Sequence, residues 1–250
     1  RVHAMTARVI MKLQVIERQD VGGGIVQLAM KHARRDTLPA WEAGAHVDLH
    51  LPDGRIRQYS LVGDPVERGR YVIAVKREDA GRGGSRWIHD NLAPGAEISV
   101  SAPRNNFPLG DDPGRHVLVA GGIGITPFVA MARELVRRNA DFTLHYCAGD
   151  TRAPLLDCLR SICGDRLVFH GPGGAGRFDA AATLAREQAG ATAIFCCGPE
   201  RLTRSVREAA QRFPEDAFHA EAFQPLLDEN FRPEPFDLTV ASTGQVIRVP

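Results

Sequence analysis

The hydrophobic pattern of this 250-residue chain changes its period near residue 110, and that change limits what the chain can fold into. Before it, apolar and polar residues alternate in short runs at 8–20, 22–32, 46–51, 56–62, 71–78 and 97–103, as in half-buried β-strands. Asp53-Gly54 between two of these runs is a strong hairpin signal. One short helix is expected within 84–95, beginning at Ser85 and stopped by Pro94-Gly95. Many short strands with a single helix predict a closed antiparallel β-barrel.

After residue 115 the apolar runs are continuous and alternate with helical segments. Strands are expected at 116–121, 141–148, 166–171, 192–198 and 217–223, with helices at 126–139, 154–162, 179–189 and 200–213. In the first helix, Phe128, Met131 or Ala132, and Leu135 recur on one face. Strands that are apolar throughout are buried on both faces, so this half predicts a doubly wound parallel α/β domain.

The chain is therefore expected to divide into four segments. These are an antiparallel barrel at 5–110, an α/β domain at 111–224, a proline-containing linker at 225–235 and a β-hairpin at 236–250. The four residues before Met5 are expected to be an expression remnant. An isolated hairpin is marginal in water, so we expect it to begin a third domain whose remainder is absent from this sequence.

Charge and cysteine content narrow the function classes. A net charge of +1 argues against nucleic acid or a membrane surface as the main partner, and no apolar run approaches membrane-span length. An odd number of cysteines predicts reduced thiols in the cytoplasm; they are Cys147, Cys158, Cys163, Cys196 and Cys197. Cys158 and Cys163 have the spacing that opens a plant-type iron–sulfur loop, but Arg166 stands where the third ligand is needed. No metal site is predicted in this chain.

A glycine-rich turn follows the first parallel strand. In "VLVAGGIGITP" (117–127), Gly121, Gly122 and Gly124 allow a sharp turn and a close backbone approach to a ligand. Thr126 is expected to cap the next helix, and Pro127 suits its first turn. The helix N-terminus then favours a polar or anionic group. By itself the pattern is equally compatible with a turn whose glycines serve packing alone.

A second turn, "CCGP" (196–199), ends the fourth parallel strand, so both turns are expected to face one crevice. Together with "RQYSL" (57–61), "GRGGS" (81–85) and "EAF" (221–223), these motifs occur in the order seen in the ferredoxin–NADP reductase superfamily. The chain, from about Arg8 to its end, most resembles the phthalate dioxygenase reductase and vanillate demethylase reductase group.

The resemblance implies that the barrel binds flavin as FMN. Arg57 resembles the partner of the flavin phosphate, Tyr59 the ring packed on the isoalloxazine, and Ser60 the hydroxyl near its N5. The implied flavin-binding residues are Arg57, Gln58, Tyr59, Ser60, Leu61, Val75, Lys76, Arg82, Gly83, Gly84 and Ser85. The group often has Thr at the position of Gln58. From the residues alone, a surface Arg57, a core Tyr59 and a Ser85 that caps its own helix remain open alternatives.

The resemblance also implies an NADH site on the α/β domain. Its residues are Gly121, Gly122, Gly124, Thr126, Pro127, Asp150, Cys197, Gly198 and Pro199, with Ser60, Cys197 and Phe223 closest to the chemistry. Asp150 is expected near the adenosine ribose, where a carboxylate accepts from a 2′-hydroxyl and repels a 2′-phosphate, although Arg152 could soften that repulsion. His46, Asp48 and His50 share a strand face, but the stretch is typical of an ordinary barrel strand in the resembled group.

The function implied is that of a monomeric NADH-dependent reductase component. It would deliver single electrons, through a C-terminal 2Fe–2S domain, to a Rieske-type oxygenase or O-demethylase. One alternative is a stand-alone NADH:flavin or cytochrome reductase with a diffusible acceptor. Another is a non-catalytic electron-transfer subunit that binds flavin without using nicotinamide.

Overall fold

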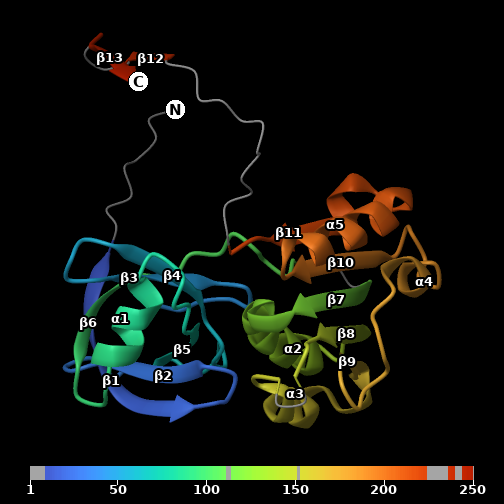
Figure 1. Cartoon of the computed structure of the whole chain (residues 1–250), viewed down its shortest axis with the longest axis horizontal. Helices are drawn as coiled ribbons and strands as arrows, with labels where there is room; N and C mark the ends of the chain where they lie inside the picture. The colour runs from blue at the N-terminus through green and yellow to red at the C-terminus, as the bar shows by residue number, and fades with distance from the viewer. Residues whose placement is uncertain (1–8, 111–113, 151–152, 224–235, 240–243, 250) are drawn as a thin grey trace.

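A computed structural model describes residues 9–110, 114–150, 153–223, 236–239 and 244–249. Two lobes lie side by side, a β-barrel formed by the first half of the chain and an α/β lobe formed by the second (Figure 1). No helix among the described residues is both long and apolar enough to cross a membrane.

The first lobe is a six-stranded antiparallel barrel, as predicted. Its strands are β1 (Ile10–Asp20), β2 (Ile25–His32), β3 (His46–His50), β4 (Ile56–Ser60), β5 (Tyr71–Lys76) and β6 (Glu97–Ser101), in the order β4-β3-β6-β1-β2-β5. A bridge between Leu61 and Ile73 joins the two outer strands and closes the barrel. The predicted hairpin is confirmed, because β3 pairs with β4 and Gly54 has a φ of +85° that a residue with a side chain would rarely adopt.

The barrel helix α1 (Gly84–Asn91) does not begin as predicted. Gly83 precedes its first turn with a φ of +76°, and the Ser85 hydroxyl accepts a hydrogen bond from the backbone N–H of Glu78 at 3.0 Å. Ser85 therefore fixes the preceding loop to the helix and does not cap its own helix. The helix also ends at Asn91, before Pro94.

The second lobe is a doubly wound parallel sheet, as predicted. Its strands are β7 (Arg115–Gly121), β8 (Phe142–Cys147), β9 (Leu167–His170), β10 (Thr192–Cys197) and β11 (Phe218–Glu221), in the order β11-β10-β7-β8-β9. The chain builds outward from β7 in one direction and then returns to its other side at β10. The order therefore reverses between β7 and β10, where ligands of such sheets bind.

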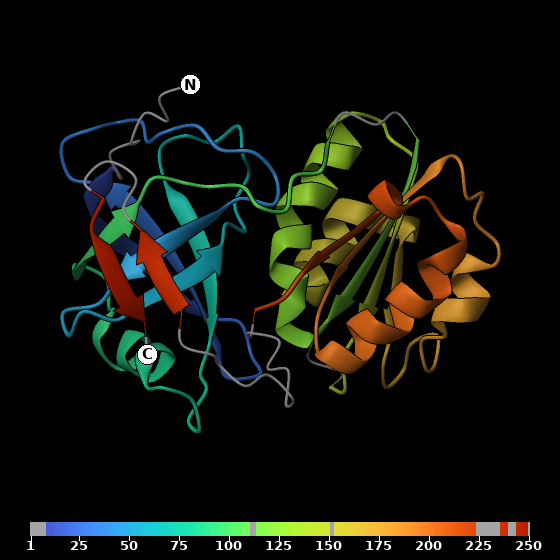
Figure 2. The same cartoon turned by 90° about the horizontal axis from the view of Figure 1, so that it is seen from above.

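Helices cover both faces of this sheet (Figure 2). Helices α2 (Thr126–Arg137) and α3 (Leu156–Cys163) belong to the core that continues into the barrel, whereas α4 (Ala180–Leu184) and α5 (Glu200–Ala209) pack with a second core on the opposite face. The predicted apolar face of α2 is confirmed, since Phe128, Met131, Ala132 and Leu135 are fully buried. Helix α4 is much shorter than the 179–189 segment predicted.

One hydrophobic core runs through the junction of the two lobes. Phe107, in the connection between them, packs edge-on against Phe128 of α2 and Phe195 of β10, at ring-centroid distances of 5.9 and 5.6 Å. Gly44 lies beneath it with a φ of +92°, and a Cβ there would overlap the Phe107 carbonyl. The junction is thus packed like an interior and not like a loose contact between domains.

The predicted hairpin near the end of the chain is present as β12 (Phe236–Thr239) paired antiparallel with β13 (Val246–Val249). Its side chains Leu238, Val246 and Ile247 are exposed. The predicted linker at 225–235 and the predicted start of the α/β domain at 111–113 lie outside the described residues.

We predict that Phe107→Ala lowers the free energy of unfolding by about 3–5 kcal/mol, the usual cost of removing a buried phenyl ring. Urea denaturation measures the change, and Val66→Ala, which truncates an exposed side chain, is the control. A loss for Phe107→Ala no larger than that of the control would mean that the two lobes do not share a core.

Candidate functional site

The glycine turn after β7 has a different local structure from the one predicted. Residues Gly122–Ile125 form a 3₁₀ turn, and α2 continues from it at Thr126. The Thr126 hydroxyl donates to the carbonyl of Ile123 at 3.1 Å, so the predicted Thr126 cap on the α2 N–H groups is wrong. The expectation for Pro127 is confirmed, because it occupies the first turn of α2, where its missing N–H costs no hydrogen bond.

The two predicted turns meet backbone to backbone. A Cβ on Gly124 would overlap the carbonyl oxygen of Cys197, and a Cβ on Gly198 would lie 3.0 Å from the Cα of Gly121. Glycine at these positions is therefore needed for the close approach itself. The contact brings the ends of β7 and β10 together at the point where the strand order reverses.

A crevice of about 680 Å³ opens beside this contact. The α/β lobe contributes the glycine turn and the ends of β8, β9 and β10, while the barrel contributes Gly23, Ile25 and Lys76. Among the predicted NADH residues, those that line it are Gly121, Gly122, Asp150 and Pro199. Arg177 and Arg201 add positive charge to the walls. A largely apolar crevice that is shared by two lobes and carries cations on its walls suits a dinucleotide, which has both rings and phosphates.

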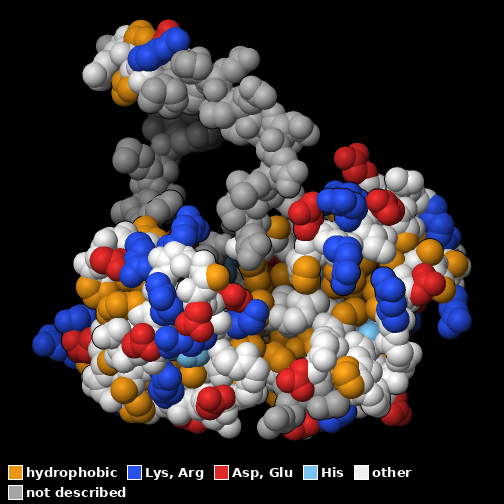
Figure 3. All heavy atoms as spheres, in the orientation of Figure 1, with side chains coloured by type: hydrophobic (Ala, Val, Ile, Leu, Met, Phe, Trp, Pro, Cys, Tyr) orange, Lys and Arg blue, Asp and Glu red, His pale blue; other side chains and the backbone are white. Residues whose placement is uncertain are grey.

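The N-terminus of α1 forms a second anion-binding element, on the barrel. The Arg57 side chain lies directly over Gly84, where a Cβ would overlap its Nε, and Arg55 lies against Gly83. Backbone N–H groups of the first turn have no partner within the helix, since the first helical bond is Trp87 N–H to Gly83. Lys and Arg side chains are prominent over this face of the barrel (Figure 3).

The two arginines of this element differ in their charge balance. Arg55 is paired with Asp53, and the hydrogen bonds between them lower the pKa of Asp53 to about 2. Arg57 donates to the carbonyl of Ile56 at 2.8 Å and forms no ion pair among the described residues. Arg57, the glycine loop and the helix N-terminus together fit a phosphate group. We call this set the phosphate cradle.

The other predicted flavin residues divide by exposure. Gln58 is exposed, Ser60 is buried, and Tyr59 is half-buried, with burial raising the pKa of its hydroxyl to about 12. Lys76 lines the crevice and pairs with Glu78 at 2.7 Å. Leu61 and Val75 are fully buried in the barrel core, and their predicted contacts with a flavin stay predictions. Arg82 is exposed and its carbonyl accepts from Arg55.

Cys197 and Phe223 contrast in the same way. Cys197 is fully buried beneath the glycine turn, and burial raises the pKa of its thiol well above the usual range. A thiol held protonated is a poor nucleophile, which argues against covalent catalysis by Cys197. Phe223 follows β11 and is 47% exposed, so its ring is open to a ligand.

Sequence reasoning missed Glu221, the first residue of "EAF". It lies beside Cys197 in the register of β10 and β11, and its Oε2 is buried without a hydrogen-bond partner among the described residues. Burial raises the pKa of Glu221 to about 7. Its position in the motif was visible in the sequence, but its burial depends on the packing of β11 against β10.

Two possible metal sites receive no support. Asp48 is paired with Arg104 at 2.7 Å, and no group of three or more potential metal-binding side chains occurs among the described residues. Cys158 and Cys163 both lie on α3 and are free thiols.

Comparison with known proteins is consistent with this architecture. No protein-family model matches the chain. Vanillate O-demethylase oxidoreductase of Pseudomonas sp. (strain HR199 / DSM 7063) is 42% identical over 237 residues, which cover 92% of this chain and 74% of that protein. Phthalate dioxygenase reductase of Burkholderia cepacia is 34% identical over 245 residues, covering 96% of this chain and 76% of that protein.

A solved structure shows the same arrangement. Phthalate dioxygenase reductase, described as a modular structure for electron transfer from pyridine nucleotides to a 2Fe–2S centre, superposes with a TM-score of 0.81 at 33% identity. The match covers 96% of this chain and 76% of that one.

The barrel, the parallel sheet and the shared crevice define the class of protein: an NAD(P)H-dependent flavoprotein oxidoreductase with the ferredoxin–NADP reductase fold. Within that class, the chain belongs to the family of oxygenase reductase components that includes vanillate O-demethylase oxidoreductase and phthalate dioxygenase reductase.

We predict that Glu221→Gln changes how stability depends on pH. The native pKa of Glu221 is raised from 4.5 to about 7, so the folded protein holds the proton more tightly and loses stability as the pH rises through this range. Between pH 5.5 and 8 the loss from this group is about 1–2 kcal/mol. Glu221→Gln should remove this loss of stability. Urea denaturation at pH 5.5 and pH 8 measures the change, and Glu208→Gln, at an exposed site, is the control. An unchanged pH dependence would mean that Glu221 ionises normally.

Proposed function

We propose that this chain is an NADH-dependent FMN reductase that supplies single electrons to a Rieske-type oxygenase or O-demethylase. The observation that carries the proposal is the position of the nucleotide crevice. It is lined from both lobes, with the glycine turns on one side and barrel residues Gly23, Ile25 and Lys76 on the other. Such a crevice lets a nicotinamide on the α/β lobe reach a flavin held by the barrel.

The phosphate cradle favours FMN over FAD. Arg57 supplies a planar guanidinium for bidentate pairing, and the α1 N-terminus supplies backbone donors, which together suit a terminal phosphate monoester. Trp87 is the aromatic side chain next to the cradle, and it packs against the barrel core. This packing covers part of its ring, which favours a structural role for Trp87 over stacking on an adenine.

The protein's part in the reaction is mainly positional. The bound flavin would accept a hydride from the nicotinamide and release the electrons singly. Tyr59, Ser60 and the 57–61 strand would hold the isoalloxazine, and the open ring of Phe223 would occupy the nicotinamide position until the nucleotide arrives. The close backbone contact of Gly124 with Cys197 would hold the two turns in place beside the nucleotide.

We propose NADH as the preferred nucleotide. Asp150 lines the crevice after β8. A carboxylate there would accept a hydrogen bond from the 2′-hydroxyl of the adenosine ribose and repel a 2′-phosphate. Arg152, which could reduce the repulsion between Asp150 and a 2′-phosphate, lies outside the described residues.

The proposed electron path continues beyond the flavin through a 2Fe–2S domain. The β12–β13 hairpin supports this path because Leu238, Val246 and Ile247 are 46%, 60% and 44% exposed, as expected of a strand pair whose apolar side chains pack on more protein. The solved relative is described as carrying electrons from pyridine nucleotides to such a centre. Five free thiols are consistent with a cytoplasmic protein.

Anaerobic titration of the purified protein tests the proposed function. The expected preparation is yellow and releases FMN on heating, and its flavin colour bleaches rapidly with NADH and with a lower kcat/KM for NADPH. Ferricyanide should then be reduced, while cytochrome c reduction by these 250 residues should be poor. Release of FAD would contradict the FMN assignment, and a preference for NADPH would contradict the role of Asp150.

The same titration separates the alternatives. Flavin that binds but does not bleach with NADH identifies a non-catalytic electron-transfer subunit. A second comparison uses a form extended by a 2Fe–2S domain. If these 250 residues support oxygenase turnover at the same rate as the extended form, the reductase needs no further domain to pass electrons on.

We predict that Arg57→Ala weakens FMN binding by roughly 2–5 kcal/mol, the range for removing one partner of a desolvated charge pair. Fluorescence titration of the deflavinated protein with FMN measures the change. Arg160→Ala, which removes an exposed arginine of α3, is the matched control. Equal affinities for the two variants would remove Arg57 from the flavin site.

A further inference from the structure

Two histidines meet on the β8–β9 side of the sheet. His145 of β8 and His170 of β9 have their rings stacked at a centroid distance of 5.3 Å, with His145 Nδ1 and His170 Nε2 3.0 Å apart. Phe178 contacts both rings, at 5.4 Å from His145 and 5.1 Å from His170. The other ring nitrogen of His170, Nδ1, lies 3.3 Å from the carbonyl oxygen of Gly176.

The direction of these hydrogen bonds follows from elementary chemistry. A carbonyl oxygen can only accept, so His170 Nδ1 carries a proton and donates to Gly176. A neutral His170 then has an acceptor at Nε2, and His145 must donate to it from Nδ1. Burial lowers the pKa of both rings, to about 4 for His145, with the neighbouring His170 and then Arg115 also opposing its charge. The chain from His145 through His170 to Gly176 is therefore intact at neutral pH.

These hydrogen bonds hold His170, which is part of a wall of the nucleotide crevice. His170, Arg177 and Phe178 line the crevice, whereas His145 does not. The loop between His170 and Arg177 folds back on β9, because the N–H of Ala175 donates to the carbonyl of Phe169 at 2.8 Å. His145 therefore does not reach the crevice itself but contacts two residues that line it, His170 and Phe178.

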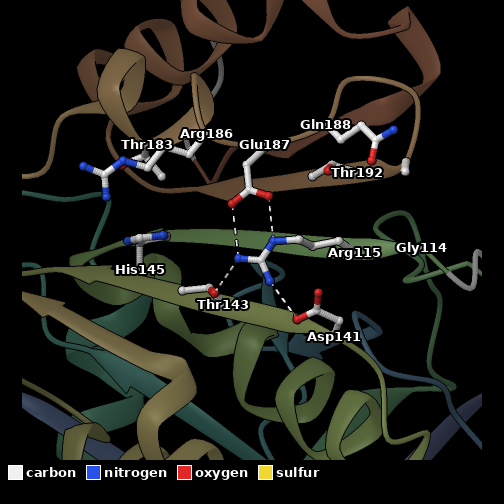
Figure 4. Close-up of a pocket in the computed structure, with 11 residues that line it drawn as sticks. Gly114, Arg115, Asp141, Thr143, His145, Thr183, Arg186, Glu187, Gln188 and Thr192 are labelled. Carbon is white, nitrogen blue, oxygen red and sulfur yellow. Dashed lines mark hydrogen bonds and ion pairs between the residues drawn. The ribbon is translucent and has the colours of Figure 1, made fainter.

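A separate hydrogen-bonded group lies at the start of β8. There Asp141 and Thr143, together with Glu187, bind Arg115 at the start of β7 (Figure 4). None of these residues lines the crevice. His145 lines the same hollow as these residues, but its hydrogen bond is made to His170 and not to this group. The Arg115 group joins strand starts, whereas the histidine pair joins the interior of β8 to the last residue of β9.

The strand order indicates which half of the nucleotide meets this wall. Cys197 and Glu221, at the nicotinamide end of the proposed site, lie on β10 and β11, whereas His170 lies on β9, at the other edge of the sheet. From β10 to β9 there are three strand spacings, about 14 Å in all. An extended dinucleotide with its nicotinamide over β10 directs its adenosine half toward β9.

We propose that His145 is a positioning residue for the adenosine half of the nucleotide, holding His170 and Phe178 as the wall that receives it. This inference rests on the proposed function, because it takes the crevice to be the pyridine-nucleotide site. Both nitrogens of His170 are engaged within the protein, so the wall offers ring surface to the ligand and not a hydrogen bond. Ring surface of this kind stacks on a purine.

Three variants separate positioning from general packing. His145→Leu removes the donor to His170, and His145→Asn restores an amide N–H close to the position of Nδ1. Thr143→Val, on the same face of β8, removes a hydrogen bond to Arg115 instead and is the control. Thermal melting of each variant establishes that it is folded.

The probes are ADP-ribose, NADH and reduced nicotinamide mononucleotide, which lacks the adenosine half. His145→Leu should raise the Kd of ADP-ribose and the KM of NADH roughly 3- to 10-fold, as expected for loss of one net hydrogen bond. The kcat with NADH and the rate with reduced nicotinamide mononucleotide should not change. His145→Asn should recover most of the ADP-ribose affinity, and Thr143→Val should bind as the unmodified protein does.

Equal ADP-ribose affinity in His145→Leu and the unmodified protein would overturn the inference. So would an equal loss of rate with both reduced nucleotides, because that pattern indicates general damage to the fold. If the unmodified protein binds ADP-ribose but NADH does not bleach its flavin, the proposed function fails while the role of His145 in binding stands.

Discussion

The contact between two backbone turns, Gly121–Gly124 after β7 and Cys197–Gly198 after β10, is the constraint on which the rest of this structure depends. It lies where the strand order of the sheet reverses, and it leaves no space for a Cβ on Gly124. Side chains at Gly124 or Gly198 would force the two turns apart. The crevice beside this contact is lined from both lobes.

The remainder of the site supplies charge and burial around this opening. On the barrel, Arg57 and the first turn of α1 gather donors for a phosphate, and the Phe107 contacts fix that lobe against the sheet. On the sheet, Cys197 and Glu221 are held in low-polarity surroundings that disfavour their charged forms. Cations such as Arg177 and Arg201 lie along the walls of the crevice, whereas these two groups lie outside its lining.

Features set by local sequence could be predicted, and features set by tertiary packing could not. The Asp53-Gly54 hairpin, the apolar face of α2 and the position of Pro127 follow from turn chemistry, helical periodicity and the proline ring. Thr126 was predicted as a cap because of its residue type, and capping by Ser85 was an open alternative, but nearby loops offered both hydroxyls other partners. Helix α4 ends early although its sequence pattern continues. The roles of Glu221 and His145 depend on neighbouring strands, which no single stretch of sequence reveals.

The central claim is that a nucleotide binds in the crevice beside the Gly124–Cys197 backbone contact and reaches the flavin there. Gly124→Ala tests it directly, with Gly190→Ala, whose added Cβ would meet nothing within 4 Å, as the matched control. Stopped-flow measurement should show that NADH bleaches the flavin of Gly124→Ala far more slowly than that of the control, while flavin content and reduction by dithionite are equal in both. Bleaching by NADH at equal rates in the two variants would contradict the account.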